Sequence, residues 1–182
     1  TGGSMTVSAW CTATALNTSW QCLVAKGEGN GWRMHRRGGE SEFAWTGGVG
    51  DTPAHGTQIM VASEPETWHH LVGVTESVSG IETLYIDGVE VATKSGAVLE
   101  DRGNRMRIGE NPDALGRGWN GKVDDVAIWA RALSADEVAE IWAAGEGTSI
   151  EVLLGGGTQF AITDVTYDNK GTDDRSDDTC LL

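Results

Sequence analysis

The sequence predicts an all-β fold, a two-sheet antiparallel jelly-roll sandwich with one short α-helix docked on it near the C-terminal end. Glycine supplies 26 of the 182 residues and proline only 3, and frequent glycine is typical of a chain with many tight turns. Short strand-forming segments follow one another at roughly ten-residue spacing, which indicates a sandwich or jelly roll.

Apolar and polar residues alternate along these segments, and glycine-rich turns separate them. In the first segment Val7 and Ala9 lie opposite Ser8 and Trp10. Asp87-Gly88 is the strongest hairpin dipeptide of the chain. The predicted strands cover residues 5–12, 21–26, 32–36, 42–45, 58–62, 68–75, 83–86, 89–92, 105–109 and 123–129.

A single helix is predicted after Leu133. Ser134 is a good N-cap, and Glu137 three residues later completes a capping box. Leu133 and Val138 can form a hydrophobic staple, and an apolar stripe continues to Trp142. A helix this short is unstable alone in water, so it must dock its stripe on the sandwich.

The composition changes near residue 150, so we predict a sandwich domain over residues 1–148. Residues 149–182 are interpreted as a linker and the truncated start of a second β module. Three consecutive glycines at 155–157 indicate a flexible joint, and the segment 160–167 alternates like a strand.

The charge balance excludes some partners. Lys and Arg number 13 against 27 Asp and Glu, which gives a net charge of −14. Nucleic-acid binding needs a basic surface, so no nucleic-acid partner is expected. No stretch approaches the roughly 18 apolar residues of a membrane span, so no membrane insertion is expected.

Cys11 and Cys22 end two candidate strands around a loop, where a disulfide is geometrically reasonable. We predict this disulfide, with two buried thiols as the open alternative.

Several segments, in this order and at this spacing, resemble a known family. They are TVSAW at 6–10, WHHL at 68–71, LYIDG at 84–88, IGE at 108–110, GKVDDVAIW at 121–129 and RALSADE at 131–137. Residues 5–145 resemble a laminin G-like jelly roll of the concanavalin A-like lectin/glucanase superfamily. The chain departs from that pattern because only residues 1–4 precede the strand that begins at Met5 and carries the TVSAW segment, where the family has a further strand.

The resemblance implies a non-catalytic recognition module of an extracellular or cell-surface protein, with carbohydrate as the expected ligand and a structural Ca²⁺ ion. A protein-interaction or spacer domain of a large surface protein is one alternative. An accessory domain of a polysaccharide-degrading enzyme is another. The Glu-x-Asp-x-x-Glu pattern of related glucanases is absent from the sequence, so we expect no catalysis.

The expected metal ligands are Asp124 and Asp125, with Asp124 favoured by the family pattern. Ca²⁺ takes oxygen ligands, and carboxylates supply them. Adjacent strand residues point to opposite faces unless a bulge intervenes, so a solvated or hydrogen-bonded role for the pair is the alternative.

The expected ligand-binding residues are three tryptophans in or beside turn-rich segments, Trp32, Trp45 and Trp119, together with Arg33. Sugar rings stack on exposed aromatic faces, and arginine grips carboxylates bidentately. A core position is the alternative for each tryptophan, and pairing with nearby carboxylates is the alternative for the arginine.

Overall fold

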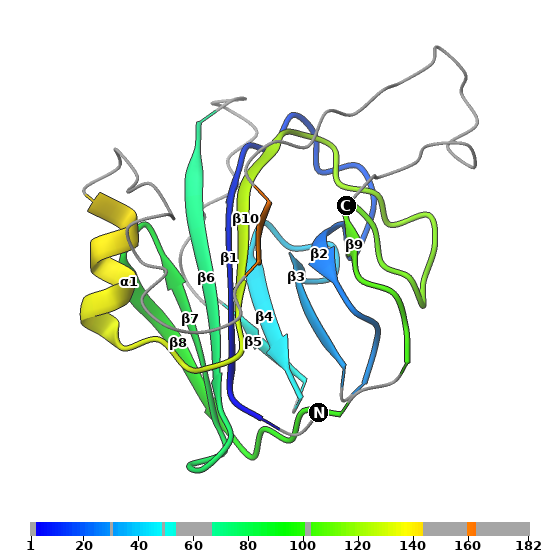
Figure 1. Ribbon diagram of the computed structural model, residues 1–182. Helices are drawn as coiled ribbons and strands as arrows, with labels where there is room; N and C mark the ends of the chain where they lie inside the picture. Colours follow the sequence, from blue (N-terminus) through cyan, green and yellow to red (C-terminus); the bar gives the residue numbers. More distant parts are fainter. Residues whose placement is uncertain are drawn as a thin grey trace.

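The computed structural model describes residues 3–29, 31–48, 50–53, 67–100 and 103–143, and the backbone of residues 160–162. It confirms an antiparallel two-sheet sandwich with one short helix (Figure 1). Sheet A has the order β11 (Phe160–Ile162), β10 (Val123–Trp129), β1 (Met5–Cys11), β6 (His69–Glu76), β7 (Ile81–Ile86) and β8 (Val89–Ser95). Sheet B has the order β5 (Asp51–Pro53), β4 (Phe43–Gly47), β3 (Trp32–Arg36), β2 (Cys22–Ala25) and β9 (Arg107–Ile108).

Nine of the ten predicted strands are present with small shifts at their ends. The predicted strand at 58–62 lies outside the described residues. Strand β5 was not predicted, because three residues with the sequence Asp-Thr-Pro carry no alternating pattern. Its existence depends on pairing with β4, where Thr52 lies opposite Trp45.

The main core lies between the two sheets. Inward-facing residues of sheet A line it, as Val7, Ala9 and Cys11 do from β1. Strands β3 and β4 are buried along their whole length. Their inward residues, such as Met34 and Trp45, pack in the core, so their outward residues must be covered by something else.

Helix α1 (Ala135–Trp142) packs on the outer face of sheet A (Figure 1). Val138 and Ile141 join Val72 and Trp129 there in a second apolar cluster. The predicted capping box is confirmed: Ser134 Oγ accepts from the Glu137 amide, and the Glu137 carboxylate accepts from the Ser134 amide. No helix in the described part of the chain has the length and apolar composition of a membrane span.

Strand β11 pairs antiparallel with the outer edge of β10, with Ile162 opposite Val126 and Phe160 opposite Ile128 (Figure 1). A strand from residues 160–162 therefore completes sheet A. The assignment of 149–182 to a linker and a second module stays a prediction.

Candidate functional site

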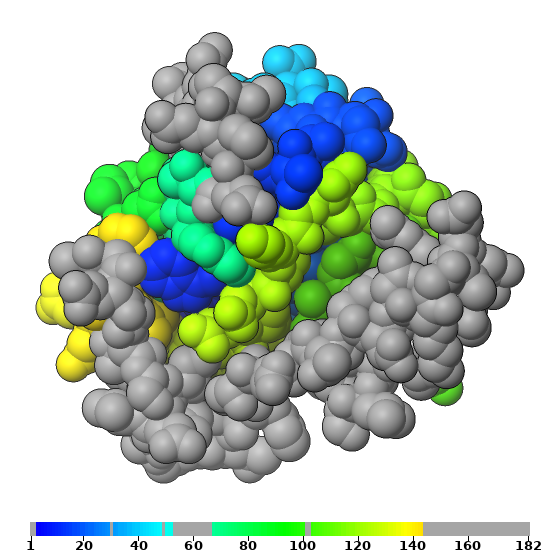
Figure 2. All heavy atoms as spheres, turned by 90° about the horizontal axis from the view of Figure 1, so that it is seen from above, coloured from blue at the N-terminus to red at the C-terminus, as the bar shows by residue number. Residues whose placement is uncertain are grey.

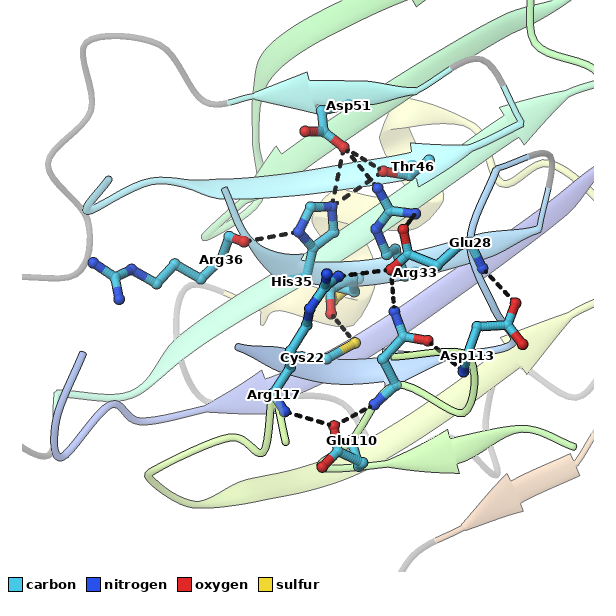
Figure 3. Close-up of polar contacts among 12 residues, drawn as sticks. Cys22, Glu28, Arg33, His35, Arg36, Thr46, Asp51, Glu110, Asp113 and Arg117 are labelled. Atoms are coloured by element: carbon cyan, nitrogen blue, oxygen red, sulfur yellow. Dashed lines mark hydrogen bonds and ion pairs between the residues drawn. The ribbon is translucent and has the colours of Figure 1, made fainter. Parts of the chain in front are cut away.

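Polar side chains gather on the outer face of sheet B (Figure 3). Strand register places Arg33 opposite Thr46, and Thr46 opposite Asp51, in one row across β3, β4 and β5. Cross-strand partners point to the same face of a sheet, so these side chains all face away from the core. We define the sheet B polar cluster as Glu28, Arg33, His35, Thr46, Asp51, Glu110, Asn111, Asp113 and Arg117.

Arg33 lies at the centre of this cluster and is only 9% exposed. Its Nη2 donates to Asp51 Oδ1 at 3.2 Å, and its Nη1 lies 3.5 Å from Glu28 Oε2. Within the described residues, its Nε and Nη1 are buried without a hydrogen-bond partner. Buried donors of a charged group are costly to leave unsatisfied. Asp51 and Glu28 therefore hold the guanidinium in place without using all of its donors.

The loop after β9 forms one wall of the site. The Glu110 carboxylate accepts the backbone amides of Asn111, Gly116 and Arg117 at 2.8–3.1 Å, and so fixes the loop from within. Arg117 Nη1 and Asn111 Nδ2 both donate to Glu28 Oε1, at 2.8 and 2.6 Å. Arg117 and Glu28 remain about one-third exposed, at 31% and 37% of their side chains. They can reach a ligand at the surface.

His35 and Asp51 lie beside Arg33 on the same face of sheet B. The His35 ring is fully buried, its Nδ1 donates to the Arg36 carbonyl at 2.8 Å, and burial lowers its pKa. Burial alone would raise the pKa of Asp51, but the contact with His35, the hydrogen bond from Thr46 and the charge of Arg33 hold it well below its usual range. Asp51 is therefore ionised near neutral pH beside the Arg33 guanidinium.

Trp20 is a candidate that the sequence did not reveal. Its backbone is left-handed, with φ of 65°, and its amide donates to the Gly38 carbonyl at 2.9 Å. Its half-buried ring packs beside His35, with 5.7 Å between the centroids. A partly exposed aromatic ring next to this cluster can stack on a sugar. Trp20 lies in a connection without periodicity, so only the tertiary structure brings it to sheet B.

The three predicted tryptophans lie in the core, and this corrects their expected role as sugar platforms. Trp45 is completely buried and donates from Nε1 to Thr75 Oγ1 at 3.1 Å. Trp32 packs against Trp45, and Trp119 stacks on Phe43. Rings between two sheets offer no face to a ligand. Of the four predicted ligand-binding residues, only Arg33 lies in the candidate site.

Asp124 and Asp125 are both exposed and lie at a bulge in the pairing of β10 with β1. Asp125 is left-handed, with φ of 45°, and its amide donates to Asp124 Oδ1 at 2.9 Å. Partial burial and the neighbouring Asp124 charge raise the pKa of Asp125. In the described ranges, no third acidic, histidine or cysteine side chain joins the pair. Two carboxylates do not by themselves fit the six to eight oxygen ligands of Ca²⁺.

The predicted disulfide is also corrected. Cys11 and Cys22 are free and buried. Cys11 faces the core from β1 in sheet A, whereas Cys22 lies opposite His35 on β2 in sheet B and donates to the Met34 carbonyl at 3.6 Å. The loop between the two strands carries the chain from one sheet to the other, so the two thiols face different surroundings.

The comparisons with known proteins agree with this architecture. A laminin G-type model of the Concanavalin A-like lectin/glucanases superfamily matches residues 1–139. No curated protein matches the chain.

Solved structures share the fold at low sequence identity. The NanB sialidase of Streptococcus pneumoniae aligns with a TM-score of 0.61 and 19% identity over 76% of this chain and 24% of its own. Domain 4 of AbnA, a GH43 extracellular arabinanase of Geobacillus stearothermophilus, was solved in complex with arabinotriose. It aligns with a TM-score of 0.58 and 18% identity over 76% of this chain and 66% of its own. The CBM40 of a Ruminococcus gnavus IT-sialidase, bound to α2,3-sialyllactose, aligns with a TM-score of 0.54 and 12% identity over 76% of this chain and 82% of its own.

These neighbours include carbohydrate-binding modules, and identities this low show a shared fold. The chain spans only 24–40% of the length of three longer neighbours. The family match covers most of the chain and coincides with the sandwich and its capped helix. The chain therefore belongs to the Concanavalin A-like lectin/glucanases superfamily.

Proposed function

We propose that this domain is a non-catalytic carbohydrate-recognition module and that its sugar site is the sheet B polar cluster with Trp20. The observation that carries the proposal is the pair formed by Arg117 and Glu28, a guanidinium donor and a carboxylate acceptor that lie side by side and about one-third exposed next to the buried Arg33. A sugar hydroxyl can accept a hydrogen bond from such a guanidinium and donate another to the neighbouring carboxylate.

The surroundings of Arg33 support the same function. Glu28 and Arg117 offer acceptors and donors at the surface, and Trp20 offers a ring. Sugar sites combine an aromatic surface with a few fixed polar groups. Structural neighbours carry arabinotriose and sialyllactose, and one belongs to an extracellular enzyme, so we extend carbohydrate binding and an extracellular location to this chain as part of the proposal.

Binding to an oligosaccharide array, followed by calorimetry with the best ligand, tests the proposal. Trp20→Ala and Arg117→Ala should each weaken binding at least about tenfold, which corresponds to about 1.4 kcal/mol. Trp68→Ala and Arg131→Ala are the matched controls. Trp68 is more exposed than Trp20, at 39%. Arg131 is an exposed arginine that pairs with Glu137 beside α1, on the other sheet.

Three results would contradict the proposal. An array without any bound glycan would favour a protein-interaction or spacer domain. Equal losses in the site variants and the matched controls would move the site away from sheet B. Release of reducing sugar from a bound glycan would contradict the non-catalytic assignment and is measured on the same samples.

A further inference from the structure

Trp20 has a backbone conformation that is unusual for its residue type. Its φ of 65° lies in the left-handed region, which glycine and asparagine adopt readily but a bulky aromatic residue seldom does. Such a conformation is energetically unfavourable and persists only where the surrounding structure holds it. The Trp20 ring therefore depends on neighbouring groups that fix the backbone beside it.

Two chain segments lie against Trp20. Thr18 belongs to the connection between β1 and β2, and Gly38 to the connection between β3 and β4. The Trp20 amide donates to the Gly38 carbonyl at 2.9 Å, and its ring lies so close to Gly38 that a Cβ there would contact it. The position of the ring therefore follows from how these two segments are held together.

The guanidinium of Arg36 joins the two segments. On one side, its Nη1 donates to the Thr18 carbonyl at 2.9 Å and to Gln21 Oε1 at 3.4 Å. On the other side, its Nε donates to the Glu40 carbonyl at 2.7 Å and its Nη2 donates to the Gly39 carbonyl. Arg36 is 6% exposed, and Figure 3 shows its side chain pointing away from the other labelled residues.

The acceptors of this guanidinium are all uncharged oxygens within the described part of the chain. Three of them are backbone carbonyls on either side of Trp20, and the fourth is the side-chain oxygen of Gln21. Only arginine offers a planar fork of donors, so lysine cannot make these contacts at the same time. The buried charge of Arg36 thus serves to hold the backbone around one aromatic residue.

We propose that Arg36 is a positioning residue of the sugar site, which holds the Trp20 ring where a sugar contacts it. This inference rests on the proposed carbohydrate-binding function and goes beyond it. Arg36 does not touch the ligand and acts through Trp20 alone. Without its fork the two segments separate, Trp20 leaves its left-handed conformation, and the ring no longer faces the ligand.

Nuclear magnetic resonance of tryptophan-labelled protein tests the positioning without any ligand. Trp20→Phe assigns the indole N–H signal of Trp20, and Arg36→Lys, which keeps the charge and removes the fork, should shift or broaden that signal. Arg37→Lys is the matched control, because the Arg37 side chain is 39% exposed and pairs with Glu42 at 3.6 Å. It should leave the signal in place. A role of Arg36 in stability alone would lower the free energy of unfolding without moving the signal.

A double-mutant cycle tests how Arg36 affects affinity for the best array glycan. Arg36→Lys should weaken binding at least about fivefold, because a loosely held site binds poorly. Arg37→Lys should leave the affinity unchanged. In a Trp20→Ala background, Arg36→Lys should change the dissociation constant by less than about twofold, since the ring that it positions is absent.

Urea unfolding checks that each variant is folded under the assay conditions. If Arg36→Lys does not fold, Gln21→Met takes its place. Methionine has a similar length and removes the side-chain oxygen that accepts from Arg36. This variant should shift the same Trp20 signal.

The outcomes separate this proposal from the proposed function. An unmoved Trp20 signal in folded Arg36→Lys would overturn the positioning role. An equal loss of affinity with and without the Trp20 ring would also overturn it, because Arg36 would then act on another part of the site. If no glycan binds to the unmodified protein, the carbohydrate-binding function is wrong, and the Trp20 signal still decides whether Arg36 fixes the ring.

Discussion

The indole ring of Trp142, at the end of α1, stacks on the ring of Trp10 in β1, with centroids 5.3 Å apart and 26° between the planes. Figure 2 shows the yellow atoms of α1 against the dark blue atoms of the N-terminal part of the chain. His70 of β6 lies beside both rings, at 4.9 Å from Trp10 and 6.2 Å from Trp142. The three rings fasten the end of the helix to the outer face of sheet A.

Trp142→Ala should therefore lower the free energy of unfolding by about 2–3 kcal/mol. A fully buried tryptophan would cost about 3–5 kcal/mol, and the half-buried ring of Trp142 loses less. Urea unfolding followed by circular dichroism measures the change. Trp142→Phe, which keeps a ring against Trp10, should lower the free energy of unfolding clearly less. An unchanged midpoint for Trp142→Ala would mean that the ring does not hold the helix.

The burial of His70 predicts that the stability of the folded protein falls at acidic pH. Its ring is 1% exposed, and burial lowers its pKa to about 4, with the Asp87 charge opposing this shift. The unfolded chain takes up the proton near pH 6.5, and the folded one only near pH 4, so stability is lost as the pH falls between these values. The loss from this residue should reach about 2 kcal/mol at pH 5.

Urea titrations at pH 7, 6 and 5 measure this loss, and His70→Gln should flatten the dependence. Some dependence of the free energy of unfolding on pH should remain in this variant, because burial also lowers the pKa of His35. His69→Gln is the control, since His69 is partly exposed and pairs with Asp87 at 2.8 Å. A His70→Gln profile parallel to the unmodified protein would contradict the assignment.

The two buried cysteines should be inert in the folded protein. Burial raises the pKa of Cys22 to about 12 and that of Cys11 further, so neither forms the reactive thiolate near neutral pH. In a Cys180→Ser variant, a thiol reagent should react with no cysteine in the native state and with two cysteines after unfolding without reductant. A count of zero after unfolding would restore the disulfide that the sequence suggested.

Calcium binding at Asp124 stays a prediction of the family resemblance. If the ion binds only the folded state, a hundredfold excess over its dissociation constant adds about 2.7 kcal/mol, and the melting temperature should rise. Asp124→Asn should abolish the rise. Magnesium is the control for screening of the net charge, since it keeps its waters and fits a protein site poorly. An equal rise with both ions would contradict a calcium site.

Local patterns predicted most of the fold. The box formed by Ser134 and Glu137, the Asp87-Gly88 turn and the alternation in β1 each depend on residues close in sequence, and each is present. The predictions that failed concern features set by residues far apart in the sequence. The Trp45 ring occupies the space where a Cβ on Gly73 would lie. No sequence pattern near Trp45 reveals that Gly73, far away in the chain, leaves this space for the ring.

The candidate site was less predictable for the same reason. Arg33 was predicted from the sequence as a ligand-binding residue, but its partners come from three segments. Glu28 lies in a turn, Asp51 in a strand of three residues, and Arg117 in the loop after β9. Strand register brings Asp51 to Arg33, whereas the turn and the loop bring Glu28 and Arg117.

Strand β11 has a practical consequence for producing the domain. The family match ends at residue 139, and the helix ends at Trp142, so a gene truncated there would look complete. Such a fragment would lack the partner of Val126, Ala127 and Ile128 and leave the β10 edge open to neighbouring molecules. An expression boundary beyond Ile162 keeps that edge paired and should give the more soluble, monodisperse preparation for crystallisation or for glycan arrays.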